Sequence, residues 1–181
     1  MNAQTPIENA ADDARWTDAI AGVNTWRGAC MQCFAQAEAA ATEALLVLCR
    51  DSRHGDAVRL RQLVGQRLED LATAIGPEGP FRAQGGVAFK ALEEFRTLES
   101  LRALVGHGVS KVALDRNGKW VAIIRHLAIR KKAEERSVQI FEQVEAEQVL
   151  ADLRKKTRKL CNELERLRQG LPDAPLGSGS G

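Results

Sequence analysis

A helical repeat of apolar residues runs through segment 16–50 and constrains the fold more than any other feature. Apolar side chains recur there at steps of three and four residues, at Ile20, Val23, Trp26, Cys30, Phe34, Ala37, Ala41, Leu45 and Leu48. That spacing places them along one face of an α-helix. The repeat therefore predicts one long amphipathic helix over Trp16–Arg50.

Three further segments carry the helical period. Asp56 can cap the first, which carries Leu68 and Leu71 and ends at the Gly- and Pro-rich run 76–80. The other two are expected at about 88–105 and 145–167. Aromatic residues make up only 4% of the chain. Sheet-rich folds depend on aromatic and β-branched residues, so this composition also favours helix.

Between the last two helical segments the pattern changes to short β-rich runs. Residues 109–114 and 120–129 flank a loop that contains Asn117-Gly118, a strong hairpin turn signal. This predicts a β-hairpin near 109–130. Residues 131–136 are expected to form a charged connection, and Val138–Phe141 a third strand with Val138 and Ile140 on one face. The predicted fold class is mainly α: a helical bundle with a small antiparallel β-hairpin or meander inserted before the last helix.

The length and the ends of the chain suggest one domain with two tails. A chain of 181 residues suits a single domain. Residues 1–15 are polar and aperiodic and are assigned to a flexible N-terminal arm, and residues 16–169 to the helical domain. Residues 170–181 are assigned to a flexible tail, in which Gly177–Gly181 looks like an engineered linker.

Charge and hydropathy set the expected location. Subtracting 24 acidic from 26 basic residues gives a net charge of +2, too small to indicate nucleic-acid binding by itself.

Residues 1–13 lack the basic start and apolar core of a secretory signal. The four cysteines are therefore expected as free thiols in a reducing cytoplasm. The most apolar stretch, Ala39–Cys49, is too short to span a bilayer, so no membrane association is expected.

The spacing of Cys30 and Cys33 admits two interpretations. A lone CxxC has no second pair to complete a zinc site, and on a helix both sulfurs lie on one face beside Phe34 and Ala37. We favour small core residues over a redox or metal site. The sequence also has no phosphate-binding glycine loop, no HExxH and no paired carboxylate cluster, so we expect neither a cofactor nor a bound metal.

One Arg–His pair combines two chemically useful groups near a predicted helix end. Arg102 and His107 are five residues apart, which corresponds to about 140° around a continuous helix. Gly106 and Gly108 flank His107, and a glycine after the last periodic residue indicates a helix C-terminus. A backbone turn there would bring His107 back toward Arg102. The competing interpretation makes His107 a C-terminal cap and Arg102 an exposed helix residue.

The segment Leu101-Arg-Ala-Leu-Val-Gly-His-Gly108 resembles the R-x4-H signature of HEPN domains (higher eukaryotes and prokaryotes nucleotide-binding). The order of long helices, motif, hairpin and last helix is similar too. The resemblance implies metal-independent RNA cleavage by a homodimer in which two motifs meet. His107 would handle a proton of the ribose 2′-OH or of the leaving oxygen, and Arg102 would hold the scissile phosphate. Imidazole titrates near neutral pH, and guanidinium binds phosphate bidentately, so the residue types suit these roles.

Three hypotheses stay open. The first is a HEPN-like endoribonuclease acting on RNA, of a toxin or phage-defence system. The second is a catalytically inactive HEPN-like module that dimerises or binds a protein partner. Ala103 favours the second, because active members usually carry a polar residue there. The third is an unrelated helical adaptor. We expect a homodimer, because most homo-oligomers are two-fold dimers and the apolar stripes are wider than one small bundle needs.

Overall fold

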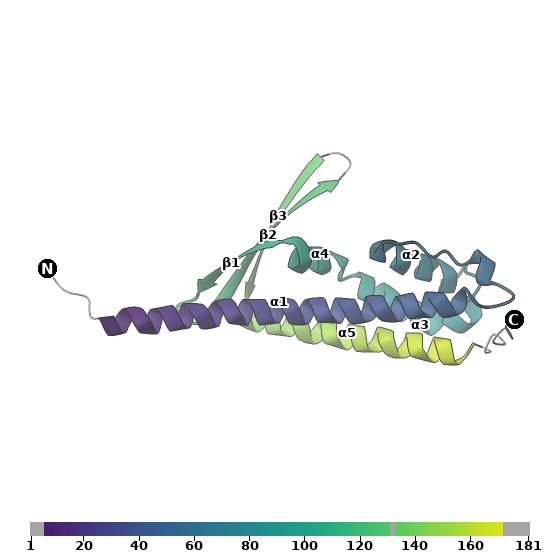
Figure 1. Cartoon of the computed structure of the whole chain (residues 1–181), viewed down its shortest axis with the longest axis horizontal. Coiled ribbons are helices and arrows are strands. Elements are labelled where there is room, and N and C mark those ends of the chain that lie inside the picture. Colours follow the sequence, from purple (N-terminus) through teal and green to yellow (C-terminus); the bar gives the residue numbers. More distant parts are fainter. Residues whose placement is uncertain (1–5, 131–132, 172–181) are drawn as a thin grey trace, which may run out of the picture. The chain divides into compact units, whose positions relative to one another are not determined.

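The computed structural model describes residues 6–130 and 133–171. The expectations for the first residues of the arm and for most of the tail lie outside these ranges. The elements, in chain order, are α1 (Pro6–Leu48), a 3₁₀ turn (Gly55–Ala57), α2 (Val64–Ile75), α3 (Arg82–Arg96), α4 (Glu99–His107), β1 (Val109–Leu114), β2 (Trp120–Arg130), β3 (Ala133–Glu142) and α5 (Gln143–Gln169) (Figure 1). This order confirms a mainly helical fold with a small antiparallel sheet before the last helix.

The first helix is longer than its apolar repeat predicts. α1 begins at Pro6, so residues 6–15 are helical rather than part of a flexible arm. Proline is well suited to the first position of a helix, where its missing N–H has no intrahelical partner. Residues 6–15 thus form helix although no apolar repeat in this part of the sequence predicts one.

The second helix begins later than predicted. Asp56 lies in the 3₁₀ turn and α2 starts only at Val64. The intervening residues are held by the Arg61 side chain, whose Nε donates to both carboxylate oxygens of Asp70 at 2.8 and 3.0 Å. The Arg61 backbone N–H also donates to Asp70 at 3.2 Å. This ion pair fixes 58–63 as an irregular segment against α2.

The predicted helix over 88–105 is two helices. The first of them, α3, begins earlier than predicted, at Arg82. The buried Gly85 in its first turn lets it approach α2 closely, because a Cβ there would lie 2.5 Å from the Cβ of Ile75. The predicted helix is interrupted at 97–98, where the Leu98 N–H bonds to the Phe95 carbonyl three residues back. The Thr97 hydroxyl donates to the Glu94 carbonyl at 2.7 Å. Such contacts at a spacing of three tighten the last turn and end the helix.

The hairpin forms as predicted, and the third strand is longer than predicted. β1 and β2 pair antiparallel from Val109↔Arg125 to Leu114↔Trp120. Gly118 has a φ of +75° in the turn, which explains the glycine there. β3 pairs with β2 from Val121↔Glu142 to Arg130↔Ala133, so most of the expected charged connection is strand. Beyond residue 125, β2 pairs only with β3.

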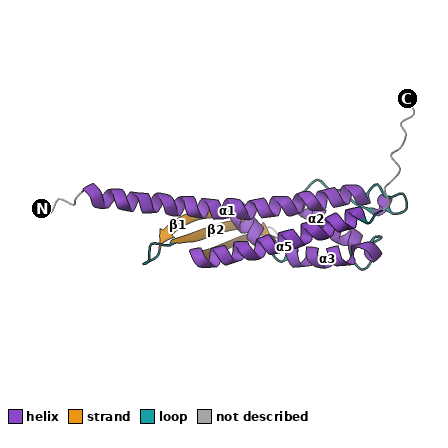
Figure 2. Ribbon diagram, turned by 90° about the horizontal axis from the view of Figure 1, so that it is seen from below, coloured by secondary structure: helices purple, strands orange, loops and turns teal. Residues whose placement is uncertain are grey.

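The chain divides into two compact units, each with its own core. Of the described residues, unit 1 comprises 6–32, 99–130 and 133–152, and unit 2 comprises 33–98 and 153–171. In unit 1 the inward face of the sheet packs against the first part of α1 (Figure 2). The Trp26 ring of α1 lies 6.1 Å from Trp120 and 5.1 Å from Phe141, between ring centroids. Ala122 and Ile124 on the same face are fully buried.

Unit 2 is a bundle of helical segments. Its core residues come from α1, α2, α3 and α5 and include Phe34, Leu45, Leu71, Phe95 and Leu160. The rings of Phe34 and Phe95 meet edge to face with centroids 5.8 Å apart. Full burial of each such side chain stabilises the fold by roughly 1.5–3 kcal/mol.

Burial confirms the core interpretation of the CxxC cysteines. Cys30 and Cys33 are only 0% and 6% exposed. Burial raises the pKa of the Cys33 thiol, and this disfavours the thiolate that metal binding and redox chemistry require.

Among the helices of the described ranges, none is both long enough and apolar enough to cross a membrane.

Candidate functional site

The two residues of the Arg–His motif do not converge within one chain. α4 continues through His107, and the Gly108 N–H donates to the Leu104 carbonyl at 2.8 Å in the helical i to i−4 pattern. The backbone therefore does not swing His107 back toward Arg102, and the two side chains leave the helix about 140° apart. His107 is exposed and Arg102 is half-buried.

His107 instead lines a pocket at the corner where α4 leads into β1. We call it the corner pocket; its volume is about 530 Å³, and it is lined by His107, Val109, Arg125, His126, Leu127, Arg136, Ser137 and Val138. The sheet register explains this grouping. Val109, Arg125 and Val138 form one row across the three strands, and Leu127 pairs with Arg136 just beyond the start of β1. β2 and β3 thus continue past β1 and leave a recess beside the end of α4.

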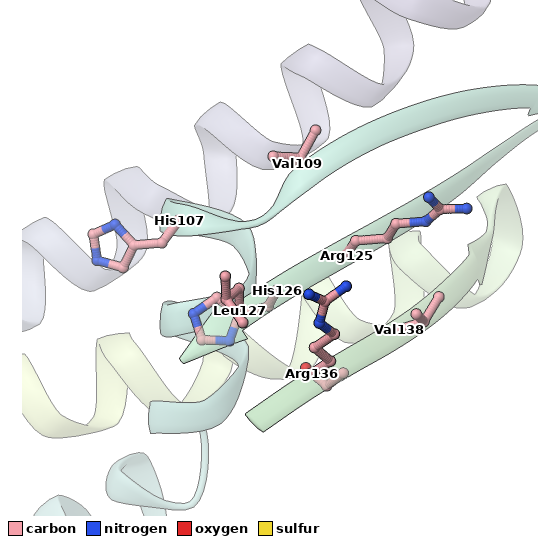
Figure 3. Close-up of a pocket in the computed structure, with 8 residues that line it drawn as sticks. His107, Val109, Arg125, His126, Leu127, Arg136 and Val138 are labelled. Carbon is pink, nitrogen blue, oxygen red and sulfur yellow. The ribbon is translucent and has the colours of Figure 1, made fainter. Parts of the chain in front are cut away.

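The corner pocket is rich in cationic and titratable nitrogen groups. Two histidines and two arginines line it, and none of its lining residues is acidic. Figure 3 shows the Arg136 guanidinium directed toward the middle of the pocket, whereas that of Arg125 extends away from His107. Arg136 also forms an ion pair with Glu134, two residues before it on β3. Such a pocket is suited to an anionic group with an apolar neighbour, because aliphatic side chains complete its walls.

Arg27 of α1 holds the backbone on both sides of His107. Its guanidinium donates to the carbonyl of Val105 at 2.7 Å, to the carbonyl of Gly108 at 3.0 Å and to the hydroxyl of Ser110 at 2.9 Å. A helix C-terminus leaves carbonyl groups without intrahelical donors, and a cation there also favours the helix dipole. Arg27 therefore fixes the junction between α4 and β1 from which His107 projects.

A second, inner cavity lies on the other side of the same strands. Its volume is about 200 Å³, and Ala103, Ser100, Glu135, Ser137 and His126 are among its lining residues. His126 and Ser137 thus line both cavities. Ala103, where the resemblance leads us to expect a polar residue in an active enzyme, also lines this inner cavity.

Sequence reasoning identified His107 but missed the arginines around it. The predicted turn already fixes the hairpin register, and extending that register from Leu114↔Trp120 places Arg125 opposite Val109. Arg136 was hidden in the expected connection 131–136. Arg27 is 78 to 83 residues away from its partners in β1 and α4, so no local signal could have indicated its role.

Within the described ranges, no group of three or more His, Cys, Asp or Glu side chains is placed to hold a metal ion.

Comparison with protein-family models, with curated proteins and with solved structures finds no match to this chain. The HEPN resemblance of Leu101–Gly108 therefore stays a prediction.

Proposed function

We propose that the chain is a HEPN-like, metal-independent endoribonuclease that acts on RNA at the corner pocket. The observation that carries this proposal is the exposed His107 in one pocket with Arg125, His126 and Arg136 and without an acidic lining residue. Guanidinium groups bind phosphate oxygens and stay charged. An imidazole can transfer protons at neutral pH, and such general acid–base catalysis contributes roughly 10²–10⁴-fold in rate.

We assign His107 the proton transfer at the ribose 2′-OH or at the leaving oxygen. Arg136 is suited to bind the phosphate because its guanidinium points into the pocket. Arg102 cannot join His107 from the same helix, since about 140° separates them. The resemblance places two motifs across a homodimer, so we assign Arg102 of a second copy to the phosphate. The chain would act in the cytoplasm as part of a toxin or phage-defence system.

The activity is tested with labelled single-stranded RNA in the presence of EDTA. We expect wild-type protein to cleave, and His107→Ala to cleave at least about 10²-fold more slowly. His54→Ala is the matched control, because His54 lies in unit 2 and edge-stacks on Phe81 instead of lining the pocket. Melting curves of all variants exclude unfolding as the cause. Absence of cleavage by wild type, or equal cleavage by His107→Ala, contradicts the proposal.

The contribution of a second copy is tested by mixing inactive variants. If Arg102 and His107 act from different chains, mixing Arg102→Ala with His107→Ala restores one complete site in each mixed dimer. Random exchange makes half of the dimers mixed, so we expect roughly a quarter of wild-type activity to return. No recovery would contradict the assignment of Arg102 of a second copy to the phosphate. Light scattering that gives a mass near 19.8 kDa would contradict the homodimer itself.

A specific observation favours the inactive interaction module as the second candidate. Ala103 stands in place of the usual polar residue, and the outward side of the sheet exposes several large aliphatic side chains. If wild type neither binds nor cleaves RNA, this module is the better account. It would act by binding a protein partner.

A further inference from the structure

The outward side of the sheet in unit 1 is a largely apolar surface, and no described element of this unit covers it. We define the outer face as the odd-numbered residues of β1 and β2 and the even-numbered residues of β3, which alternate away from the buried side. Five large aliphatic residues on it are between 58% and 82% exposed: Val109, Leu127, Ile129, Val138 and Ile140. Figure 1 shows β2 and β3 projecting away from α1 toward their hairpin end. Exposed apolar patches of this kind mark interaction sites.

The charges on the outer face are ordered. Its three middle rows each carry one cation: Lys111 in the row of Ile123 and Ile140, Arg125 in the row of Val109 and Val138, and Arg136 opposite Leu127. The row at each end carries a carboxylate instead, Glu142 at one end and Glu134 at the other. A partner that covers the middle of this face must supply both apolar contact and negative charge.

This order disfavours a second copy of the chain as the occupant. Two sheets that stack face to face by two-fold symmetry have the axis in the plane of contact. If the axis runs along the strands, each row of one chain faces the same row of the other chain. If the axis runs across the strands, the rows of the second chain meet those of the first in reverse order. Either arrangement sets the three cationic rows against cationic rows and the carboxylate rows against carboxylate rows. Like charges placed opposite one another in an interface weaken binding.

The composition of the outer face also disfavours a nucleic acid across it. Proteins that bind single strands on a sheet stack bases on outward aromatic side chains. The aromatic residues of this sheet, Trp120 and Phe141, are on the inward face and are only 8% and 6% exposed. Outside the corner pocket the face carries exposed aliphatic residues such as Ile129 and Ile140, which gain little from contact with a hydrated polyanion.

We propose that the outer face is a docking surface for an acidic, amphipathic segment of another protein, whose aliphatic side chains pack on Ile123, Ile140, Val109 and Leu127 and whose carboxylates pair with Lys111 and Arg125. The inference does not depend on the proposed ribonuclease activity. Five residues that line the corner pocket belong to the outer face as well, namely Val109, Arg125, Leu127, Arg136 and Val138. A bound partner would therefore cover much of that pocket.

The experiment selects binders of the full chain from a displayed library of random 16-residue peptides, followed by fluorescence anisotropy with one enriched peptide. We expect the enriched sequences to be net negative and to carry aliphatic residues. Ile140→Glu should weaken binding at least about tenfold, because it places a carboxylate against the apolar and acidic partner. Val87→Glu is the matched control: Val87 is 63% exposed on α3, outside the outer face. It should leave binding unchanged.

Three results would overturn the docking inference. The first is a library that yields no peptide binding wild type better than Ile140→Glu, and the second is enrichment of basic sequences. The third is that Ile140→Glu abolishes a wild-type dimer or the binding of an RNA oligonucleotide, which would identify a second copy or RNA as the occupant. Ile140 does not line the corner pocket. RNA cleavage should therefore survive Ile140→Glu, and loss of cleavage with peptide binding intact would count against the proposed activity alone.

Discussion

Trp26 in α1 donates its indole N–H to the carbonyl oxygen of Ala146 in α5, at 2.8 Å, although 120 residues separate them. The same indole lies against Trp120 and Phe141, and it is only 4% exposed. One side chain thus joins the first helix, the sheet and the start of the last helix in unit 1. Buried indoles usually find such a partner, because an unpaired buried N–H is costly.

Replacing Trp26 by phenylalanine should destabilise unit 1. Trp26→Phe removes the hydrogen bond to Ala146 and leaves a void beside Phe141. We expect the free energy of unfolding to fall by about 1–3 kcal/mol, measured by chemical denaturation. Trp16→Phe is the control, because Trp16 is 43% exposed. It should change stability by less than about 0.5 kcal/mol. Equal effects of the two substitutions would contradict the assigned role of the Trp26 hydrogen bond.

The two glycines beside His107 should respond to alanine in opposite ways. A Cβ at Gly108 would lie 2.4 Å from Ile124 Cγ2 and 2.4 Å from the Leu104 carbonyl oxygen, so Gly108→Ala forces the backbone to move. At Gly106 the nearest atom is the Met31 sulfur at 3.4 Å. We expect Gly108→Ala to lower the unfolding free energy by about 1–3 kcal/mol. Gly106→Ala should be neutral or stabilising by up to about 1 kcal/mol, through helix propensity.

Thermal melts of both glycine variants check this pair. A Gly108→Ala protein as stable as wild type would show that the backbone at Gly108 does not pass this close to Ile124.

Features that depend on neighbouring residues were predictable from the sequence, and features that depend on distant contacts were not. The hairpin was predictable because Asn117-Gly118 and its flanking runs act within a few residues. The length of β3 was not predictable, because nearly all of its residues are exposed. Charged residues such as Glu134 and Arg136 are typical of a loop. The late start of α2 was not predicted either, because residues 58–63 are held by the Arg61–Asp70 pair, whose partners are nine residues apart.

At the candidate site, too, residues with local sequence signals were predictable and contacts between distant residues were not. His107 was identified because glycines and a helix end are local features. Its expected approach to Arg102 failed because Gly106 stays helical, which depends on the packing of the α4 end and on the carbonyl contacts of Arg27. The position of Arg125 could have been predicted from the hairpin register. The role of Arg27 could not, because its hydrogen-bond partners are distant in the sequence.

Removing the Arg27 guanidinium should loosen the α4–β1 junction. Arg27→Gln loses donors to Val105, Gly108 and Ser110, and hydrogen bonds from a charged donor contribute about 1.5–3 kcal/mol. We expect faster amide hydrogen exchange at 105–110 and a lower unfolding free energy. Arg15→Gln, at an exposed position of the same helix, is the control. Unchanged exchange at 105–110 in Arg27→Gln would show that the carbonyl contacts do not hold the junction.

The Asp70 carboxylate should make unit 2 sensitive to acid. It is 3% exposed, and its hydrogen bonds from Arg61 hold its pKa below the ordinary value of about 4. A carboxyl whose pKa is lower in the folded state stabilises the fold above its unfolded pKa, and this contribution is lost as pH falls through the folded pKa. Arg61 is 37% exposed, so solvent screens the pair, and we expect Asp70→Asn to cost about 1–2 kcal/mol at pH 7. The difference from wild type should shrink below about pH 4. Denaturation curves from pH 7 to 3 check this, with the exposed Asp56→Asn as control; a difference that stays constant over that range would contradict the role of the pair.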